Sequence, residues 1–479
     1  MQALYRSHQT KPIDEAAAAY LQIDSYQLMQ RAAQAVYRHI GEAYSLLVVT
    51  GPGNNGGDGW VIAELARRDH KNVVVWALQN PENLTGDAAK AAADYQGEVI
   101  FSAPCEDKSF DLLVDAIFGT GLTRAPGGIY QDAIDFINDH SARVLAVDIP
   151  SGLAGDTGLA YAPAVRANIT VAILHMMPGH VTADGQDYCG ELKLDRLAVP
   201  DTAYRAIDPA AYVLNHALLN PLKKSRKHNS HKGSYGRLLV AGGQHGMLGA
   251  VLLSGTAALV SGAGLVQLIT TEEQAPWVPV HRPELMALGF SGSEQQLHIP
   301  KADVLVMGMG LGTSQWSKAL WQQLLEAGMP TVLDADGLNL LAGSQTAPDS
   351  LKVITPHPKE AARLLKCAVD DIQADRLGAC QKLAEKYNCV VVLKGSGTVI
   401  SDGEETFICP FGSADLATAG TGDVLSGMTG SLLAQGLTAI QSAQMAVVWH
   451  ALTADECALG RCLTASDLIH CLPQSLIQS

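Results

Sequence analysis

The sequence predicts an α/β protein with two domains. Short apolar runs of strand length recur along both halves of the chain, and segments with helical spacing lie between them. Most of these runs end in glycine-rich or polar loops, such as residues 51–59, 308–312 and 394–398. A length of 479 residues is also too great for one ordinary hydrophobic core. We therefore expect a first domain at residues 1–215 and a second at residues 222–479.

The composition excludes some classes of function. A net charge of −15 argues against general nucleic-acid binding. It does not exclude an anionic small molecule, because backbone N–H groups bind phosphate without net positive charge. As partners we expect small-molecule substrates, no nucleic acid and no membrane, with assembly into a homo-oligomer.

Cysteine usage and hydropathy indicate the compartment. The nine cysteines are an odd number without any C-x-x-C pair, which predicts a reducing compartment, no disulfide framework and no zinc site. Residues 1–11 lack the apolar core of a signal peptide, and no apolar run reaches the roughly 18 residues that span a bilayer. We expect a cytoplasmic protein.

The first half contains a strand–loop–helix–strand unit. Helical spacing over residues 14–40 precedes a buried strand at 46–49, which leads into the glycine loop 51–59. A helix is expected from about Trp60 to Asp69, followed by a strand at 73–77. This order predicts a Rossmann-like domain with three layers, αβα, although the loop is not the dinucleotide motif G-x-G-x-x-G.

Polar side chains follow the strands of this first domain. Strands at 112–115 and 144–148 also end in polar loops, and ligands of open α/β sheets bind at such strand ends. The candidates for one shared crevice are Asn54, Asn55, Asp58, Asp115, Asp148 and Ser151, although an Asp at a strand end can also be a simple turn former.

The residue types in these loops indicate the chemistry. Asn55, Asp115 and Ser151 are oxygen ligands suited to magnesium or to a cation of low charge density. Asp148 is the best acid/base candidate. No His or Cys lies in these loops, so proton abstraction and return, as in an isomerase or epimerase, is favoured over triad hydrolysis.

Three motifs in order, residues 53–59, 118–122 and 147–152, resemble the NAD(P)H-hydrate epimerase domain over about residues 1–215. The resemblance implies K⁺ bound by Asn55, Asp115 and Ser151, and Asp148 at the reacting carbon. It also implies two loops that bind the hydrated dinucleotide. Their residues are Asn54, Asn55, Gly56, Gly57, Asp58, Gly119, Thr120, Gly121, Leu122, Thr123, Arg124 and Ala125.

Residues 200–234 interrupt the alternation, and the basic run 223–228 stands out in an acidic chain. A solvated linker is the simpler interpretation of this run. The alternative is a positive lip near a phosphate-bearing ligand. We place the domain boundary near residues 215–225.

The second half repeats the pattern of strands that end in polar or glycine loops. Strands are expected at 238–241, 304–307, 332–333, 353–354 and 390–393. The segment 249–264 is small and apolar, as in a helix that packs closely or contacts a ligand. His357 lies between two prolines, and Lys394 is a plausible point charge for a phosphate, although a surface lysine beside a turn is the simpler alternative.

The segment 418–427 contains G-x-G-D at the start of an apolar helix. Helix N-terminal amides attract an anion, and Asp423 would then hold a proton-transferring carboxylate beside that anion. A glycine turn with Asp423 as a plain helix cap is the alternative for an isolated motif. Neither a P-loop nor a kinase loop is present, so nucleotide binding requires another fold.

The loops that follow the strands of the second half, together with the segment 418–427, resemble the ribokinase-like superfamily. Within it they resemble the NAD(P)H-hydrate dehydratase, from about residue 222 to the C-terminus. The resemblance implies that Ala250, Gly310, His357 and Asp423 contact the hydrate. It implies a nucleotide site with Mg²⁺ on the phosphates, formed by Lys394, Gly395, Ser396, Gly397, Thr398 and Gly422.

The resulting hypothesis is a bifunctional repair enzyme. The first domain would interconvert the R and S hydrates of NADH and NADPH, and the second would dehydrate the S form with ADP, which gives AMP and phosphate. One alternative is a vitamin or sugar kinase that releases a stable phosphorylated product. The other is a non-enzymatic module whose first domain binds nucleotides or proteins.

Overall fold

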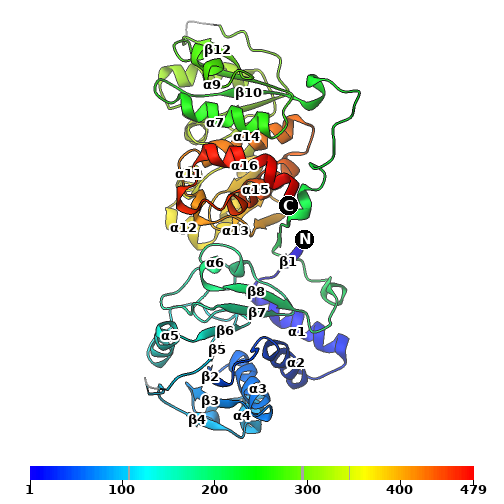
Figure 1. Cartoon of the computed structure of the whole chain (residues 1–479), viewed down its shortest axis with the longest axis vertical. Coiled ribbons are helices and arrows are strands. Elements are labelled where there is room, and N and C mark those ends of the chain that lie inside the picture. The colour runs from blue at the N-terminus through cyan, green and yellow to red at the C-terminus, as the bar shows by residue number, and fades with distance from the viewer. Residues whose placement is uncertain (106–107, 293–295, 345, 479) are drawn as a thin grey trace. The chain divides into compact units, whose positions relative to one another are not determined.

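The computed structural model describes residues 1–105, 108–292, 296–344 and 346–478, and the chain divides into two units, residues 2–212 and 213–479 (Figure 1). Parallel sheets with helices form both units, so the predicted α/β class is confirmed. No helix in the described part of the chain is long and apolar enough to cross a bilayer.

The first unit is built on a parallel sheet in the order β4-β3-β2-β5-β6-β7-β8. Its strands are β2 (Ser45–Thr50), β3 (Asn72–Ala77), β4 (Glu98–Ile100), β5 (Leu112–Ala116), β6 (Arg143–Val147), β7 (Ile169–Ile173) and β8 (Glu191–Asp195). Its helices are α1 (Ser7–Leu21), α2 (Ser25–Tyr37), α3 (Asn54–Arg68), α4 (Gly86–Asp94), α5 (Ile129–Asp139) and α6 (Gly185–Tyr188). The short strand β1 (Gln2–Leu4) precedes α1, and β9 (Ala211–Val213) lies at the boundary between the two units in the sequence.

Alternate residues of β2 enter two different cores. Leu46 and Val48 pack with α2, α3 and α4, whereas Leu47 and Val49 pack with α5. Side chains of a strand point to opposite faces in turn, so a strand buried on both faces is apolar throughout. The first unit therefore has the three predicted layers, and the carboxyl ends of its strands are left to the loops.

Two helix boundaries differ from the sequence prediction. The helical segment predicted at 14–40 is two helices, because Gln22 is left-handed with φ 56° and Asp24 caps α2 by accepting from the N–H of Gln27 at 2.8 Å. The predicted loop 51–59 ends early, because α3 begins at Asn54. Glycines usually favour loops, but here close packing requires them inside the helix. A Cβ on Gly56 would lie 2.0 Å from the carbonyl oxygen of Gly51, so only glycine fits at this position.

The second unit contains a sheet in which the strand order runs β18-β17-β16-β15-β14-β13-β10-β11-β12. Neighbours from β16 to β12 are parallel, whereas β16, β17 and β18 pair antiparallel. The strands are β10 (Arg237–Ala241), β11 (Leu265–Thr271), β12 (Met286–Phe290), β13 (Val304–Met307), β14 (Thr331–Leu333), β15 (Leu351–Ile354), β16 (Val390–Leu393), β17 (Thr398–Ser401) and β18 (Thr406–Cys409). The helices are α7 (Leu248–Val260), α8 (Val278–His281), α9 (Gln315–Glu326), α10 (Asp336–Gly343), α11 (Pro358–Leu365), α12 (Val369–Ala374), α13 (Arg376–Tyr387), α14 (Thr421–Ala434), α15 (Ala439–Cys457) and α16 (Ala465–Gln478).

Glycines set how closely α14 approaches its neighbours. A Cβ on Gly427 would lie 2.0 Å from the carbonyl oxygen of Ser254 in α7, and one on Gly430 would lie 2.1 Å from Cγ2 of Val306 in β13. The helix is buried along most of its length, and its residues are mostly small or apolar. This contact fixes α14 on the sheet and directs its N-terminus toward the carboxyl ends of β13 and β14.

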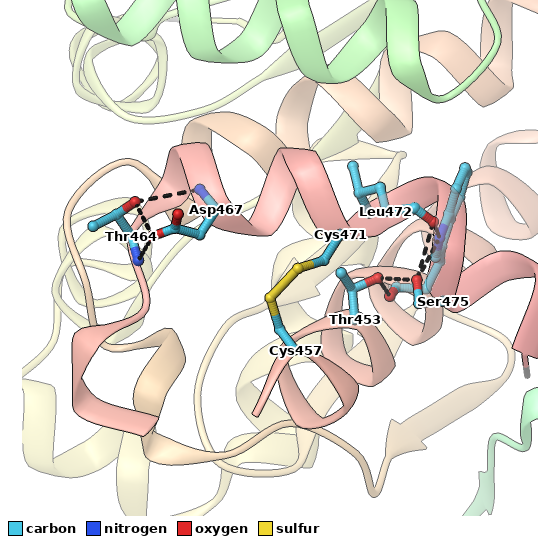
Figure 2. Close-up of a disulfide and its surroundings, with 8 residues drawn as sticks. Thr453, Cys457, Thr464, Asp467, Cys471, Leu472 and Ser475 are labelled. Carbon is cyan, nitrogen blue, oxygen red and sulfur yellow. Dashed lines mark hydrogen bonds between the residues drawn. A yellow bond between two sulfur atoms is a disulfide. The ribbon is translucent and has the colours of Figure 1, made fainter. Parts of the chain in front are cut away.

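The structure contains one feature that contradicts the cysteine prediction. Cys457 at the end of α15 and Cys471 in α16 form a disulfide, with 6.1 Å between their Cα atoms (Figure 2). The hydroxyls of Thr453 and Ser475, which belong to the same two helices, are 2.6 Å apart. The expectation of no disulfide is therefore wrong, because packing of α15 on α16 pairs two cysteines that no local motif connects.

Candidate active sites

The first unit has a cavity of about 530 Å³ at the carboxyl ends of β2, β5 and β6. Loops from three strands and residues of α1, α2 and α3 line it. Most of the dinucleotide-site residues that the sequence predicted are among them, namely Asn54, Asn55, Asp58, residues 119–124 and Asp148. The cavity is therefore formed by the loops that follow the carboxyl ends of the strands, where ligands of open α/β sheets bind.

Three predicted residues lie elsewhere. Gly56 and Gly57 are buried in α3 and do not line the cavity, and a Cβ on Gly57 would lie 2.6 Å from Cε of Met29. Ala125 is exposed and also outside the lining. The two glycines therefore serve the packing of α3 against its neighbours.

Asp115, Ser151 and Asn55 are connected through Phe118. The carboxylate of Asp115 accepts from the Ser151 hydroxyl at 2.6 Å and from the Ser151 N–H at 2.7 Å. The amide of Asn55 donates to the carbonyl oxygen of Phe118 at 2.9 Å, and the Phe118 N–H donates to the Ser151 hydroxyl at 2.9 Å. Burial raises the pKa of Asp115 to about 6, and the hydrogen bonds from Ser151 oppose that rise. No cationic side chain pairs with Asp115 among the residues that the structure describes.

Asp148 follows β6 in a left-handed backbone conformation with φ 63°. Its N–H donates to the carbonyl oxygen of Val171 at 2.9 Å, and its Oδ1 accepts from the N–H of Ile173 at 3.3 Å. Burial raises the pKa of Asp148 to about 6. A carboxyl held this way exchanges protons near neutral pH, as an acid/base group requires.

His180 supports the backbone of Asp148, and the sequence analysis missed it. Its Nδ1 accepts from the N–H of Met177 at 2.9 Å, so Nε2 carries the proton and donates to the carbonyl oxygen of Asp148 at 2.9 Å. Burial lowers the pKa of His180 to about 4, which keeps the ring neutral. The only sequence signal was a histidine after a proline and a glycine, which does not reveal its target.

Three further carboxyls line the same cavity, of which Asp87 is paired with Lys90 at 2.7 Å, whereas Asp58 and Asp14 have no cationic partner in the described structure. Burial raises the pKa of Asp58 well above its ordinary value, and Asp148 adds to the rise. The Oδ1 of Asp58 is buried without a hydrogen-bond partner in the described structure. Asp14 on α1 was not predicted. It lies on a helix that is distant in sequence from the strand-end loops, so no local pattern indicates that it reaches the cavity. Burial, and then the charge of Asp148, raise the pKa of Asp14 to about 7.

The second site lies where α14 begins. Gly420 caps the helix with φ 92°, and Asp423 lies in its first turn. A Cβ on Gly422 would lie 3.4 Å from Nζ of Lys394, so the lysine comes close to the helix N-terminus. Burial and the charge of Asp334 raise the pKa of Asp423 to about 7, and Lys394 partly offsets them. A potential base, a cation and helix amides thus converge.

Lys394 is held by a buried ion pair. Its Nζ lies 2.8 Å from Oδ1 of Asp334, and the Ser426 hydroxyl donates to Oδ2 of Asp334. Burial alone would raise the pKa of Asp334, but Lys394 and Ser426 outweigh it and hold the pKa below its ordinary value. Burial alone would lower the pKa of Lys394. The negative charges of Asp334 and Glu360 outweigh that effect, so the pKa of Lys394 is raised.

His357 caps α11 rather than lying in a core. Its Nδ1 accepts from the N–H of Lys359 at 3.0 Å, and its side chain is about half exposed. Burial and then Lys394 hold the pKa of His357 below its ordinary value, so the ring is neutral near pH 7. Its Nε2 lies 3.4 Å from Oε1 of Glu360, a buried acid that the sequence analysis did not identify.

The remaining predicted residues lie in two groups, around Gly310 and in the loop that begins at Lys394. A Cβ on Gly310, which has φ 57°, would lie 3.2 Å from Cβ of Ala250, so the loop after β13 touches the start of α7. The loop 394–398 joins β16 to β17, and the buried Arg376 donates to the carbonyl oxygens of Leu393 and Lys394 at 3.3 Å. Arg376 was not predicted, because a helix residue 18 positions away carries no sequence signal for this loop.

The basic run 223–228 does not border the Asp423 site. Lys224, Arg226 and Lys227 line a separate cavity of about 650 Å³ together with residues 260–262 and Gln435. Gln435 follows the C-terminal end of α14, and 14 helical residues extend roughly 21 Å. The run therefore lies at the opposite end of that helix from Asp423, and the positive lip near a phosphate-bearing ligand stays a prediction.

Comparisons with known proteins cover both units. Residues 238–474 match the family model described as NAD(P)H-hydrate dehydratase, and residues 25–179 match the YjeF-related protein N-terminus. The bifunctional NAD(P)H-hydrate repair enzyme Nnr of Coxiella burnetii is 40% identical over 98% of this chain and 98% of its own length. The enzyme of the same name from Escherichia coli is 39% identical over 95% of this chain and 90% of its own.

One solved structure supports the fold of the second unit. The ADP/ATP-dependent NAD(P)H-hydrate dehydratase of Bacillus subtilis, co-crystallised with ATP/Mg²⁺, superposes with a TM-score of 0.52 at 28% identity. It covers 56% of this chain and 98% of that chain. A crystallised ribokinase-like protein of Enterococcus faecalis gives a TM-score of 0.51 at 26% identity, covering 57% of this chain and 97% of that chain. The predicted ribokinase-like fold is confirmed.

Proposed function

Because the chain belongs to the bifunctional NAD(P)H-hydrate repair enzymes, with an epimerase and a dehydratase domain, we propose how its two sites divide the reaction. Residues 1–215 interconvert the R and S hydrates of NADH or NADPH at Asp148. Residues 222–479 dehydrate the S hydrate at Asp423 and convert ADP to AMP and phosphate. The observation that carries the proposal is the convergence of Asp423 and Lys394 at Gly422.

In the dehydratase site, Asp423 takes the proton of the hydrate hydroxyl as that oxygen attacks the terminal phosphoryl group. Hydroxide leaves poorly, whereas phosphate leaves readily, so phosphorylation followed by loss of phosphate, and of a proton from the adjacent ring carbon to solvent, restores the ring double bond. Lys394 and the amides of Gly420 and Gly422 lie where negative charge develops on the phosphoryl group. Ala250, Gly310 and His357 contact the hydrate.

The nucleotide binds along residues 394–398 and Gly422. At nucleotide sites, Mg²⁺ is usually bound by phosphate oxygens, waters and one or two carboxylates. This site fits that pattern, because its described residues contain no cluster of three or more metal-ligating side chains. When bound, the ion neutralises charge on the phosphates. The protein's own contribution is the position of Lys394, which its ion pair with Asp334 fixes.

In the epimerase site, the cavity-lining residues Asn54, Asn55, Asp58 and 119–124 hold the dinucleotide, and Asp148 transfers a proton at the hydroxyl group that is inverted. Asn55, Asp115 and Ser151 would hold K⁺. The donor set fits this ion, because the buried Asp115 carboxylate has no cationic partner in the described structure and hydroxyl and carbonyl oxygens surround it. The ion would compensate that charge and order the loop at Phe118. Homo-oligomer formation stays a prediction from the sequence.

Removal of K⁺ is expected to lower the epimerisation rate at least about tenfold, because the Asp115 charge would lose its counter-ion and the 118–124 loop, bonded to Ser151 and Asn55 through Phe118, would lose its fixed position. Epimerisation is measured by chromatography of the two hydrates in buffers containing K⁺, Na⁺ or a bulky organic cation at equal ionic strength. Dehydration of S hydrate in the same buffers is the control for general salt effects. Equal epimerisation in all three buffers would contradict the K⁺ assignment.

The whole proposal is tested by supplying one hydrate at a time together with ADP. We expect S hydrate to return fully to the absorbance of the reduced nicotinamide, and R hydrate to return through the first site, each with one AMP and one phosphate. A stable phosphorylated product without free phosphate would instead support a kinase. Binding of the hydrates without any turnover would support a non-catalytic module.

A further inference from the structure

The cavity of the first unit holds more acid/base chemistry than one carboxyl provides. Asp14, Asp58 and Asp148 all line it, and they come from α1, from α3 and from the end of β6. The proposed function, on which the following inference rests, assigns proton transfer to Asp148 alone. Inversion of a stereocentre requires a group to leave one face and a group to enter the other, and one carboxyl serves both faces poorly.

The position of Asp14 is fixed by its helix. Ile13 and Ala17 of α1 are buried in a core shared with α2. At the start of the helix, the N–H and hydroxyl of Ser7 donate to Asp156 at 2.6 and 2.9 Å. These contacts set the rotation of α1, and residues four apart share a helix face, so Thr10 and Asp14 both line the cavity.

The side chain of Asp14 has no structural task in the described part of the chain. No hydrogen bond or ion pair is formed by its carboxyl there, whereas its neighbour Glu15 is exposed and lies 3.9 Å from Lys11. Burial first, and then the charges of Asp148 and Glu15, raise the pKa of Asp14 to about 7. The pKa of Asp148 is about 6, so these two carboxyls have similar proton affinities. Burial, and then the charges of Asp148 and Asp14, raise the pKa of Asp58 well above its ordinary value.

We infer that Asp14 is the second proton-transfer group of the epimerase and works with Asp148 on the hydrate. Both side chains border the same cavity from different secondary-structure elements, and the Asp14 carboxyl forms no hydrogen bond or ion pair with the residues that the structure describes. The Oδ1 of Asp58, which has no hydrogen-bond partner in the described structure, is left to contact the bound ligand.

The step balances in atoms and electrons. The hydroxyl of the hydrate is on the ring carbon next to the ring nitrogen. Protonated Asp14 gives its proton to that oxygen, the C–O bond breaks, and water leaves with the electron pair while the nitrogen lone pair forms a C=N⁺ bond. Water then adds to the other face, the π electrons return to nitrogen, and the Asp148 carboxylate takes the released proton. The enzyme is left ready for the opposite epimer, as in a two-base racemase.

The test compares Asp14→Asn with Glu15→Gln, which likewise replaces a carboxyl by an amide at the adjacent, exposed position of the same helix. For Asp14→Asn we expect kcat for epimerisation to fall about a hundredfold or more in both directions, because general acid–base catalysis contributes about that much. KM is expected to change less than about threefold. Glu15→Gln should match the wild type, and Asp14→Glu should recover part of the rate.

Two further readouts make the outcome decisive. Dehydration of S hydrate by the same full-length variants reports whether the chain has folded. The wild-type pH profile of kcat/KM should have two limbs, and Asp14→Asn should lose one of them. Unchanged kcat in Asp14→Asn, a loss confined to KM, or an equal loss in Glu15→Gln would overturn the inference. If Asp14→Asn does not fold, an unchanged pH limb in Asp14→Glu overturns it. Full activity of Asp148→Asn would instead contradict the proposed function.

Discussion

Asp423→Asn is expected to lower kcat for dehydration by about a thousandfold or more, since it removes the base while the helix amides and Lys394 remain. The rate is measured from the return of nicotinamide absorbance with S hydrate and ADP. Asp402→Asn, in the exposed turn between β17 and β18, is the matched control and should match the wild type. Full turnover of Asp423→Asn would show that another group takes the proton.

The same carboxyl predicts the pH dependence and separates catalysis from folding. Burial and Asp334 raise the pKa of Asp423 to about 7, so kcat/KM of the wild type should rise with pH up to about 7 and then level off. A raised folded-state pKa means that ionisation of Asp423 costs stability as the pH rises from 3.8 toward 7. The variant should therefore unfold no more easily than the wild type at pH 8, although it is inactive.

Asp148→Asn should reduce epimerisation about a thousandfold and leave dehydration unchanged. With a mixture of hydrates and ADP, the variant should restore the S fraction rapidly and leave R hydrate to its uncatalysed interconversion. Asn tolerates the left-handed backbone that Asp148 adopts at φ 63°, so the loop should keep its conformation. The measurement is the amount of each hydrate remaining over time.

The control for Asp148→Asn is Asp139→Asn at the exposed end of α5, which should epimerise like the wild type. If Asp148→Asn instead epimerises at the wild-type rate, the cavity binds the dinucleotide without using this carboxyl. Loss of both activities would indicate a folding defect rather than a catalytic role.

Sequence patterns predicted the parts of the sites that local order controls. The strand runs at 46–49 and 304–307 are apolar because both faces are buried, and their loops follow directly, so Asn55, Asp148 and Gly310 could be assigned to strand ends. The G-x-G-D motif could be placed at the start of α14 for the same reason.

The residues that sequence reasoning missed reach their sites through packing. Asp14 arrives on a helix that precedes the sheet, His180 contacts a backbone carbonyl 32 positions away, and Arg376 reaches its loop from α13. The Cys457–Cys471 disulfide belongs to the same class, since it depends on how α15 and α16 pack. Such contacts depend on side-chain direction in the folded chain, which spacing along the sequence does not record.

The close seating of α14 on α7 and β13 has a consequence for how the second site handles different substrates. The contacts at Gly427 and Gly430 leave no space for the helix to slide, so the carboxylate of Asp423 keeps a fixed position relative to the sheet. Any accommodation of a bulkier or smaller dinucleotide must then come from the ligand or from the surrounding loops. The catalytic carboxylate therefore stays fixed relative to the sheet, and differences between coenzymes are accommodated by the loops around the site.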